Sequence, residues 1–410
     1  MSHQFAIAYF VLLAGLAMFR PLADRGYALS KPFALLIIGF TFWLANTARI
    51  IPNSRLGIIL VMLLVGALSA LFVYRERDDL LAWLKARWRY ILAVEAGFLL
   101  VFAVAVWLRA MVGQINFTEQ PMDLMFLNAT TRAENFPPKD PWLSGHTVAY
   151  YYFGYLMVGM VGVVAGVPTA IGYNIGFGMI AALSMAAAFG LSYNLIRIRD
   201  DVVEGEAAAA APAAKKRERR AEPAVAAGER GSLAMAMASG ELRWRPATFG
   251  IAGALLLVVA GNFVWLLMFA SAYGIGSEGF YSWIDIDSLS ANEPRATWYP
   301  SSYFGFFNAS RIYLIDDGFR AITEFPMFSF ILGDMHPHVM SLPFVALVAS
   351  MALAFFRSRE PLDIVYWLQR PLLLLGAAIL LGGLAFLNTW DIATMAFVVV
   401  VAAFASNYGR

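Results

Sequence analysis

The sequence predicts an all-α fold, a polytopic bundle of transmembrane helices, on three observations. Hydrophobic residues make up 60% of the 410 positions, and the mean hydropathy is +0.65. Charged residues make up only 14%, whereas soluble domains carry about 25%. The apolar residues gather in about ten runs near the span length of about 20 residues. Cysteine is absent, which excludes thiol chemistry, disulfides and Cys-ligated zinc. The net charge of +2 gives no indication of nucleic-acid binding.

The runs that we predict to cross the membrane follow one another along the whole chain. They lie at 5–19, 33–47, 56–74, 90–112, 149–166, 169–197, 246–273, 339–356, 371–388 and 392–407. The first run lacks a basic region before it and a small-residue cleavage site after it. We therefore interpret it as a retained span with its N-terminus outside the cell.

Basic residues predict which loops face the cytoplasm. The segment 75–89 carries five of them and is placed inside, which puts the loop 113–148 outside. Arg357, Arg359 and Arg370 place 357–370 inside and 274–338 outside. Three predicted spans lie between these two net-acidic loops, however, which would put the loops on opposite faces. Either one run is re-entrant, or one of the runs 169–197 and 246–273 is two short helices.

The segment 203–242 differs in composition from the rest of the chain. It is rich in alanine, carries the basic cluster Lys215–Arg220 and has no apolar periodicity. This composition is typical of a disordered linker, since it cannot bury enough apolar surface to fold. The chain is thereby divided into N-terminal transmembrane helices (1–89), a first core half (90–202), the linker (203–242) and a second core half (243–410).

Aromatic residues are concentrated where the first long loop enters the membrane. A simple aromatic belt needs few such residues, so their density indicates a binding surface at the bilayer face. They are Trp142, Tyr150, Tyr151, Tyr152 and Tyr155. Two ionisable residues of the same stretch, Asp140 and His146, are candidates for acid–base chemistry.

The same loop contains a stretch, residues 122–129, that predicts a short amphipathic helix. Asp123 and Asn128 would share its polar face. A helix lying on the bilayer with an acid facing a cavity is a suitable place for a general base. The alternative is an ordinary interfacial helix with a solvated aspartate.

The end of the second loop holds the other group of ionisable residues. Asp334, His336 and His338 alternate, so an extended backbone would present all three on one side. They could bind a divalent cation or donate to phosphate oxygens, or they could form a hydrogen-bonded structural turn. Further binding candidates are Arg311, Glu324 and, at the start of the last span, Asp391.

These motifs together resemble the "YYY" family of very hydrophobic membrane proteins of bacteria and archaea. The resemblance covers about residues 90–400, and it lies in Pro137–Trp142 with the tyrosines that follow, Glu324–Pro326, Gly333–His338 and Asn388–Asp391. Members of that family look like the GT-C glycosyltransferases, which use polyprenyl-phosphate sugars at the outer membrane face. The GT-C pattern places a catalytic acid in the first long outer loop, and Asp123 fits that position.

The resemblance implies a glycosyltransferase in the cell membrane of a prokaryote, with membrane lipid and a lipid-linked sugar as partners. Asp123 would be the general base, His336 and His338 would stabilise the leaving phosphate, and the aromatic residues would stack on the sugar or the prenyl chain. The resemblance implies no particular cofactor, and a divalent cation at Asp334, His336 and His338 is one option. The alternative class is a transporter or a non-enzymatic structural subunit, which would place its ionisable residues at mid-bilayer.

Overall fold

The computed structural model describes residues 18–210, 243–286, 289, 309–314, 318 and 320–408, and it divides into two compact units. Unit 1 comprises Met1–Ala254 and Met335–Arg410, and unit 2 comprises Leu255–Asp334. Nearly all regular structure in the described residues is helical. The strands there are β1 (Tyr313–Leu314) and β2 (Arg320–Ala321), an antiparallel pair in unit 2. The predicted all-α polytopic fold is confirmed.

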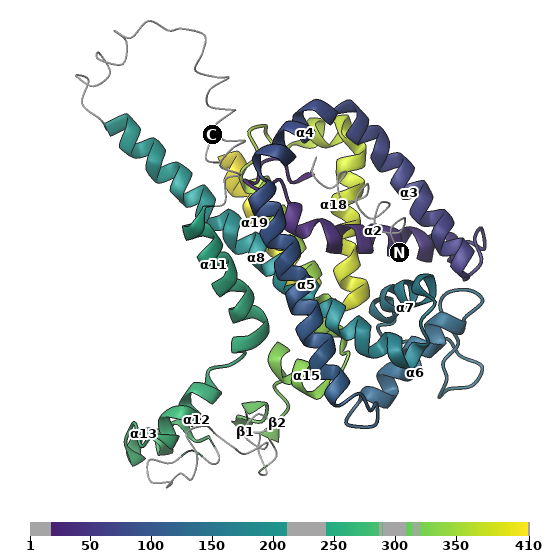
Figure 1. Cartoon of the computed structure of the whole chain (residues 1–410), viewed down its shortest axis with the longest axis vertical. Helices are drawn as coiled ribbons and strands as arrows, with labels where there is room; N and C mark the ends of the chain where they lie inside the picture. The colour runs from purple at the N-terminus through teal and green to yellow at the C-terminus, as the bar shows by residue number, and fades with distance from the viewer. Residues whose placement is uncertain are drawn as a thin grey trace, which may run out of the picture. The chain divides into compact units, whose positions relative to one another are not determined.

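Unit 1 is a bundle of helices (Figure 1) in which α8 and α16 each pack against several others. The helix α5 packs along α8, while α16 packs against α8, α18 and α19. The bounds of the unit 1 elements are η1 (Tyr27–Leu29), α2 (Ser30–Thr47), α3 (Arg55–Arg75), α4 (Arg77–Ala86), α5 (Trp88–Met111), α6 (Gln120–Arg132), α7 (Phe153–Ala165), α8 (Thr169–Ala210), α11 (Trp244–Leu255, whose last residue opens unit 2), α16 (Pro337–Phe356), α17 (Ile364–Gln369), α18 (Pro371–Leu387) and α19 (Thr389–Tyr408).

Local sequence signals set several of these helix ends. The Ser54 hydroxyl accepts from the Gly57 amide at 3.1 Å and caps the start of α3. Asp363 caps α17 in the same way through the Tyr366 amide at 2.8 Å. Gly166 ends α7 with a φ of +70°, a left-handed conformation that glycine adopts without strain.

Six helices among the described residues are long and apolar enough to cross a membrane. They are Tyr27–Thr47, Arg55–Arg75, Trp88–Met111, Thr169–Asp200, Pro337–Phe356 and Thr389–Tyr408. Three shorter apolar helices are Phe153–Ala165, Trp244–Ala260 and Pro371–Leu387. These nine helices correspond to nine of the ten predicted runs, with the run at 246–273 only partly covered. Most of the run 5–19 lies outside the described residues.

The run 246–273 is not one helix. It consists of α11, a π-helical segment η2 (Leu256–Ala260) and α12 (Val264–Ala272). Gly261, with φ +57° and ψ −136°, separates η2 from α12, a conformation that essentially only glycine adopts. This break matches one of the two alternatives that the charge pattern requires. The other alternative has a candidate in α7, whose 13 residues extend only about 20 Å.

In its described residues, unit 2 contains three short α-helices besides η2 and its strands. α12 is followed by α13 (Glu278–Ile284), and α15 (Pro326–Leu332) comes just before the end of the unit. Val264, Ala309, Phe325 and Phe328 form its small apolar cluster.

The segment predicted as a linker begins as a helix. The backbone of α8 continues from Val203 to Ala210. Residues 211–242, which include the basic cluster at Lys215–Arg220, lie outside the described residues.

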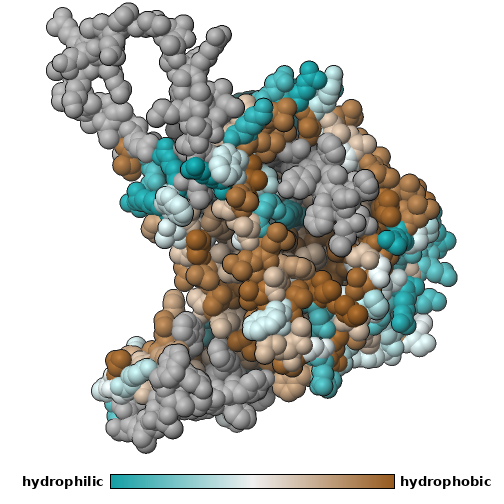
Figure 2. Space-filling view, in the orientation of Figure 1, coloured by the Kyte–Doolittle hydropathy of each residue, from teal (hydrophilic) through white to brown (hydrophobic). Residues whose placement is uncertain are grey.

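Apolar side chains cover much of the surface of unit 1, as expected for helices in contact with lipid. Figure 2 shows hydrophobic residues over much of the visible face, with hydrophilic residues gathered toward its margins. Leu99, Leu100 and Trp107 of α5 each expose more than half of their surface, and Phe397, Val400 and Phe404 of α19 do the same. In water such exposure would be unfavourable, whereas in the hydrocarbon it costs nothing.

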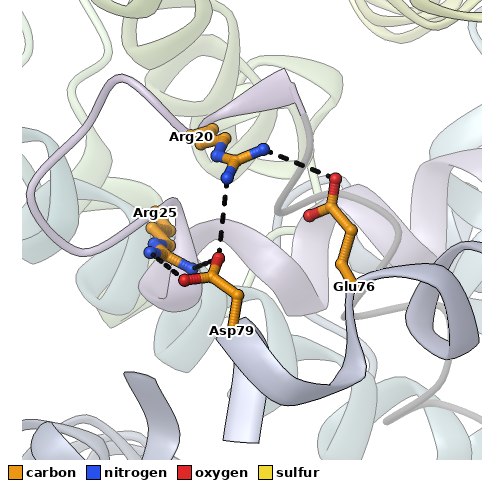
Figure 3. A network of polar contacts seen from close by, with 4 residues as sticks. All are labelled: Arg20, Arg25, Glu76 and Asp79. Carbon is orange, nitrogen blue, oxygen red and sulfur yellow. Dashed lines mark hydrogen bonds and ion pairs between the residues drawn. The ribbon is translucent and has the colours of Figure 1, made fainter. Parts of the chain in front are cut away.

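An ion-pair network joins the segment before α2 to α4 (Figure 3). Arg25 donates to Asp79 Oδ2 at 2.8 Å, and Arg20 lies 3.5 Å from Glu76 and 3.6 Å from Asp79. The hydrogen bond from Arg25 lowers the pKa of the Asp79 carboxyl below its ordinary value. A carboxyl with a lowered pKa keeps its ion pair at neutral pH and loses it as the pH falls through that pKa.

Candidate functional site

The carboxylate of Asp123 lies at the centre of the most completely buried polar cluster near the loops of unit 1. The residue is fully buried. Its Oδ1 accepts from the Tyr155 hydroxyl at 2.5 Å, and its Oδ2 accepts from the Tyr173 hydroxyl at 3.1 Å and from the Met335 amide at 2.7 Å. Three donors on three segments, α7, α8 and the chain before α16, therefore converge on one carboxylate.

Asp123 lies in the first turn of α6, so the start of this helix positions its carboxylate. Glu119 is the N-cap residue, and its carbonyl accepts from the Asp123 amide at 3.0 Å. Pro121 stands at the beginning of the helix, where its missing amide hydrogen is not needed. An acid in the first turn is also favoured by the helix dipole. The predicted helix at 122–129 is thus confirmed, with bounds Gln120–Arg132.

A second carboxylate, Glu119, stands one turn before Asp123 and pairs with a histidine. Its Oε2 lies 2.5 Å from Nε2 of His336. The Glu119 side chain is 52% exposed, whereas that of His336 is 12% exposed. Because residues 335 and 336 are adjacent, the contact of Met335 with Asp123 and that of His336 with Glu119 form two neighbouring attachments to α6.

Four aromatic rings connect the loop to this cluster, and we call them the aromatic column: Trp142, Tyr150, Phe126 and Tyr155. The Phe126 ring lies 6.4 Å from Trp142, 5.3 Å from Tyr150 in a stacked arrangement and 5.7 Å from Tyr155 between ring centroids. Trp142 is 69% exposed and Tyr155 is fully buried. The aromatic column therefore runs from an exposed surface to a residue that binds Asp123.

The three consecutive tyrosines do not share one environment. Tyr150 is exposed and belongs to the aromatic column, and Tyr151 is half-buried beside it. Tyr152 is buried, and its hydroxyl accepts from the Trp43 indole at 2.8 Å. Tyr150 therefore lies at the surface, whereas Tyr152 packs against α2.

Asp140 and His146 form a local turn. The Asp140 carboxylate accepts from the amides of Trp142 and Leu143 at 2.8 and 3.0 Å, and its amide donates to the His146 carbonyl at 2.9 Å. The His146 residue is exposed. The Asp140 carboxylate stabilises this turn, in which Trp142 lies at the surface.

The N-terminus of α16 gathers two histidines and an aspartate. The ring centroids of His336 and His338 lie 5.5 Å apart and their planes are nearly perpendicular. The Ser341 hydroxyl is within hydrogen-bond distance of the His338 carbonyl (2.9 Å) and of Asp391 Oδ2 (2.6 Å). A helix N-terminus favours anions, and imidazole N–H groups there can donate to a phosphate oxygen. A neutral imidazole is also a ligand for divalent cations.

The remaining predicted binding residues belong to unit 2. Arg311 donates to the carbonyl and hydroxyl of Ser310, Glu324 is half-buried, and Asp334 is buried with its amide bonded to the Ser329 carbonyl. The extended backbone expected from Asp334 to His338 ends at His336, because Pro337 begins α16. His338 therefore lies in the first turn of that helix, and the strict alternation of side chains ends before it.

Three residues of the cluster were not singled out from the sequence as site residues: Glu119, Phe126 and Tyr173. Each has only a weak signal in the sequence. Glu119 stands three positions before the predicted helix at 122–129, and Tyr173 places a hydroxyl inside an apolar run. The contact of Glu119 with His336 spans 217 positions of the chain, which no local pattern reveals.

The apolar helices, their lipid-facing surfaces and the polar cluster next to them define an integral membrane protein. The chain belongs to the DUF2298 family, described as uncharacterized membrane proteins, whose sequence profile matches residues 37–410. No curated protein matches the chain, and no solved structure does.

Proposed function

We propose that this protein is a membrane glycosyltransferase that uses a polyprenyl-phosphate-linked sugar. The resemblance to the "YYY" family and to the GT-C enzymes suggests the donor class. The observation that carries the proposal is the Asp123 cluster: it brings the acids of the first loop against the Met335–His336 segment at one place, beside the apolar spans. A lipid-linked donor would keep its prenyl chain in the bilayer and present its phosphate and sugar at such a place.

The chemistry of sugar transfer from a phosphate lipid needs three groups, and unit 1 offers candidates for each. A carboxylate of the first loop takes the proton of the acceptor hydroxyl, the role that the resemblance gives to Asp123. Cationic or hydrogen-bonding groups neutralise the leaving phosphate, a role that suits His338 in the first turn of α16. Aromatic faces hold the sugar, which suits the exposed rings of Trp142 and Tyr150.

We infer that the protein lies in the cell membrane of a prokaryote with both long loops outside, since basic residues concentrate at 75–89 and 357–370. The lack of native cysteine makes labelling decisive. Ser144→Cys and Glu278→Cys, both at exposed positions, are expected to react with an impermeant maleimide in intact cells. Lys85→Cys is expected to react only after permeabilisation. Labelling of Ser144→Cys and Glu278→Cys from opposite faces would contradict this orientation.

A transporter or a structural subunit is the competing class, and the position of ionisable groups separates them. Lys31 and Glu95, which lie in two different spans, pair with each other at 2.5 Å. Such a pair needs no transported ion to account for it. The pair of Glu119 and His336, in which the glutamate side chain is 52% exposed, suits an enzyme at the membrane face better.

The proposal is tested by the lipid that the protein binds. Purified protein in nanodiscs is expected to bind added polyprenyl-phosphate hexose saturably, as a mass increment in native mass spectrometry. Phosphatidylglycerol at the same concentration is the control for nonspecific lipid. Equal retention of both lipids would count against a sugar-phosphate site.

A further inference from the structure

We propose that Glu119, held by His336, is the group that takes the acceptor's proton, and that Asp123 is a positioning residue beneath it. This assignment rests on the proposed function, and it names the base that the glycosyl transfer uses. The resemblance gives the role of general base to Asp123, so the two assignments predict different effects of substitution.

Access to solvent separates the two carboxylates. A general base must come within hydrogen-bond distance of the hydroxyl that it deprotonates. The Glu119 side chain is 52% exposed. Among the described residues this carboxylate forms a hydrogen bond with His336 at Oε2, and in the proposed assignment Oε1 accepts the proton of the hydroxyl. Asp123 is fully buried, with donors on both oxygens.

His336 has the geometry of an orienting partner. Its ring is largely buried, and its Nε2 lies 2.5 Å from Glu119 Oε2. A charge-assisted hydrogen bond of this kind fixes one carboxylate oxygen and leaves the other in a defined direction. The His336 backbone is in turn fixed, because the amide of the preceding Met335 donates to Asp123.

Asp123 therefore acts through the Met335–His336 segment, which its carboxylate contacts. Tyr155 and Tyr173 hold its carboxylate from α7 and α8. The carboxylate holds the Met335 amide, and this contact sets the distance between His336 and Glu119. Because Glu119 is the N-cap of α6 and Asp123 lies one turn further on, the start of this helix carries both the reactive group and its anchor.

In the transfer step one bond forms, one bond breaks and one proton moves. The acceptor hydroxyl gives its proton to Oε1 of Glu119 while its oxygen forms a bond to the anomeric carbon. The bond between that carbon and the phosphate oxygen breaks, and the phosphate leaves with the electron pair. The products are the glycosylated acceptor and polyprenyl phosphate, and the proton on Glu119 returns to water.

The test is a double-mutant cycle of Glu119→Gln and His336→Gln, with turnover of polyprenyl-phosphate hexose measured in nanodiscs supplied with a membrane extract as acceptor. We expect Glu119→Gln to lower kcat by about 10²–10⁴-fold with the donor KM unchanged. His336→Gln is expected to lower kcat less. The double variant should match Glu119→Gln, because the histidine acts only through the glutamate. Glu134→Gln, an exposed glutamate of the same loop, is the matched control and should retain wild-type turnover.

Two failures are distinguishable. Wild-type turnover together with full turnover by Glu119→Gln would overturn the assignment of Glu119 and leave the proposed function standing. If the fold-loss in kcat of the double variant equals the product of the two single losses, Glu119 and His336 act independently. That result would overturn the proposed role of His336 as the orienting partner of Glu119. A wild-type protein that consumes no donor would remove the proposed function and this inference with it. Thermal unfolding of each variant confirms folding, and Glu119→Gln and Glu134→Gln, both at exposed positions, are expected to unfold as the wild type does.

Discussion

Asp123→Ala is expected to lower the free energy of unfolding of unit 1 by about 3 kcal/mol, because it removes the acceptor of buried donors. Tyr155 loses its hydroxyl partner, and the Met335 amide keeps only the longer contact of 3.3 Å to Tyr173. Each buried donor left without a partner costs about 1–3 kcal/mol. Asp123→Asn keeps the shape and one acceptor oxygen, so its expected loss is about 1–2 kcal/mol.

The measurement is unfolding of the purified variants in detergent, followed by circular dichroism. Asp78→Asn, a change in an aspartate whose side chain is 90% exposed, is the matched control and should unfold as the wild type does. A wild-type unfolding midpoint for Asp123→Ala would show that this carboxylate does not hold the cluster together. Turnover distinguishes the roles further: as a positioning residue, Asp123 should show losses of stability and activity together, whereas Glu119→Gln should lose activity alone.

His338→Ala is expected to weaken binding of the polyprenyl-phosphate donor by about 10–100-fold, with a smaller effect on turnover at saturating donor. His338 lies in the first turn of α16, a 20-residue helix, where the imidazole and the helix dipole both favour a phosphate. Loss of one charge-assisted hydrogen bond corresponds to about 1–3 kcal/mol, and 1.4 kcal/mol is tenfold in affinity.

Donor titration by native mass spectrometry measures this effect, with His338→Asn as the comparison. The amide keeps a neutral donor and should restore part of the affinity. A chelator titration of the wild type decides whether a divalent cation takes part, since a binding constant that chelator leaves unchanged requires none. Unchanged donor affinity in His338→Ala would place the phosphate elsewhere.

Composition and periodicity predict the transmembrane helices well, because hydrophobic length alone decides whether a segment can span the bilayer. The predicted run 56–74 corresponds to α3 (Arg55–Arg75), and the predicted run 339–356 corresponds to α16 (Pro337–Phe356). The break in the run 246–273 was foreseen only as one alternative from the charge rule. Its position at Gly261 depends on one backbone conformation, which a hydropathy pattern does not encode.

The candidate site is predictable only in part. The sequence singled out Asp123 and His336 separately, from a helical pattern and from histidine density. The Met335 amide donates to Asp123, and His336 pairs with Glu119. Each of these contacts joins positions more than 200 residues apart. The tyrosine run was expected to act as one surface, yet Tyr150 is exposed while Tyr152 is buried. Such differences depend on how helices pack, which one sequence does not state.

Turnover of a lipid-linked sugar tests the central claim most directly. Purified wild-type protein in nanodiscs would be incubated with polyprenyl-phosphate hexose and a membrane extract, and the lipids would be analysed by mass spectrometry. The account predicts free polyprenyl phosphate that accumulates with time and with enzyme, and that falls by about 10²–10⁴-fold in Glu119→Gln. Intact donor at all times, from protein that is folded and binds lipid, would contradict it.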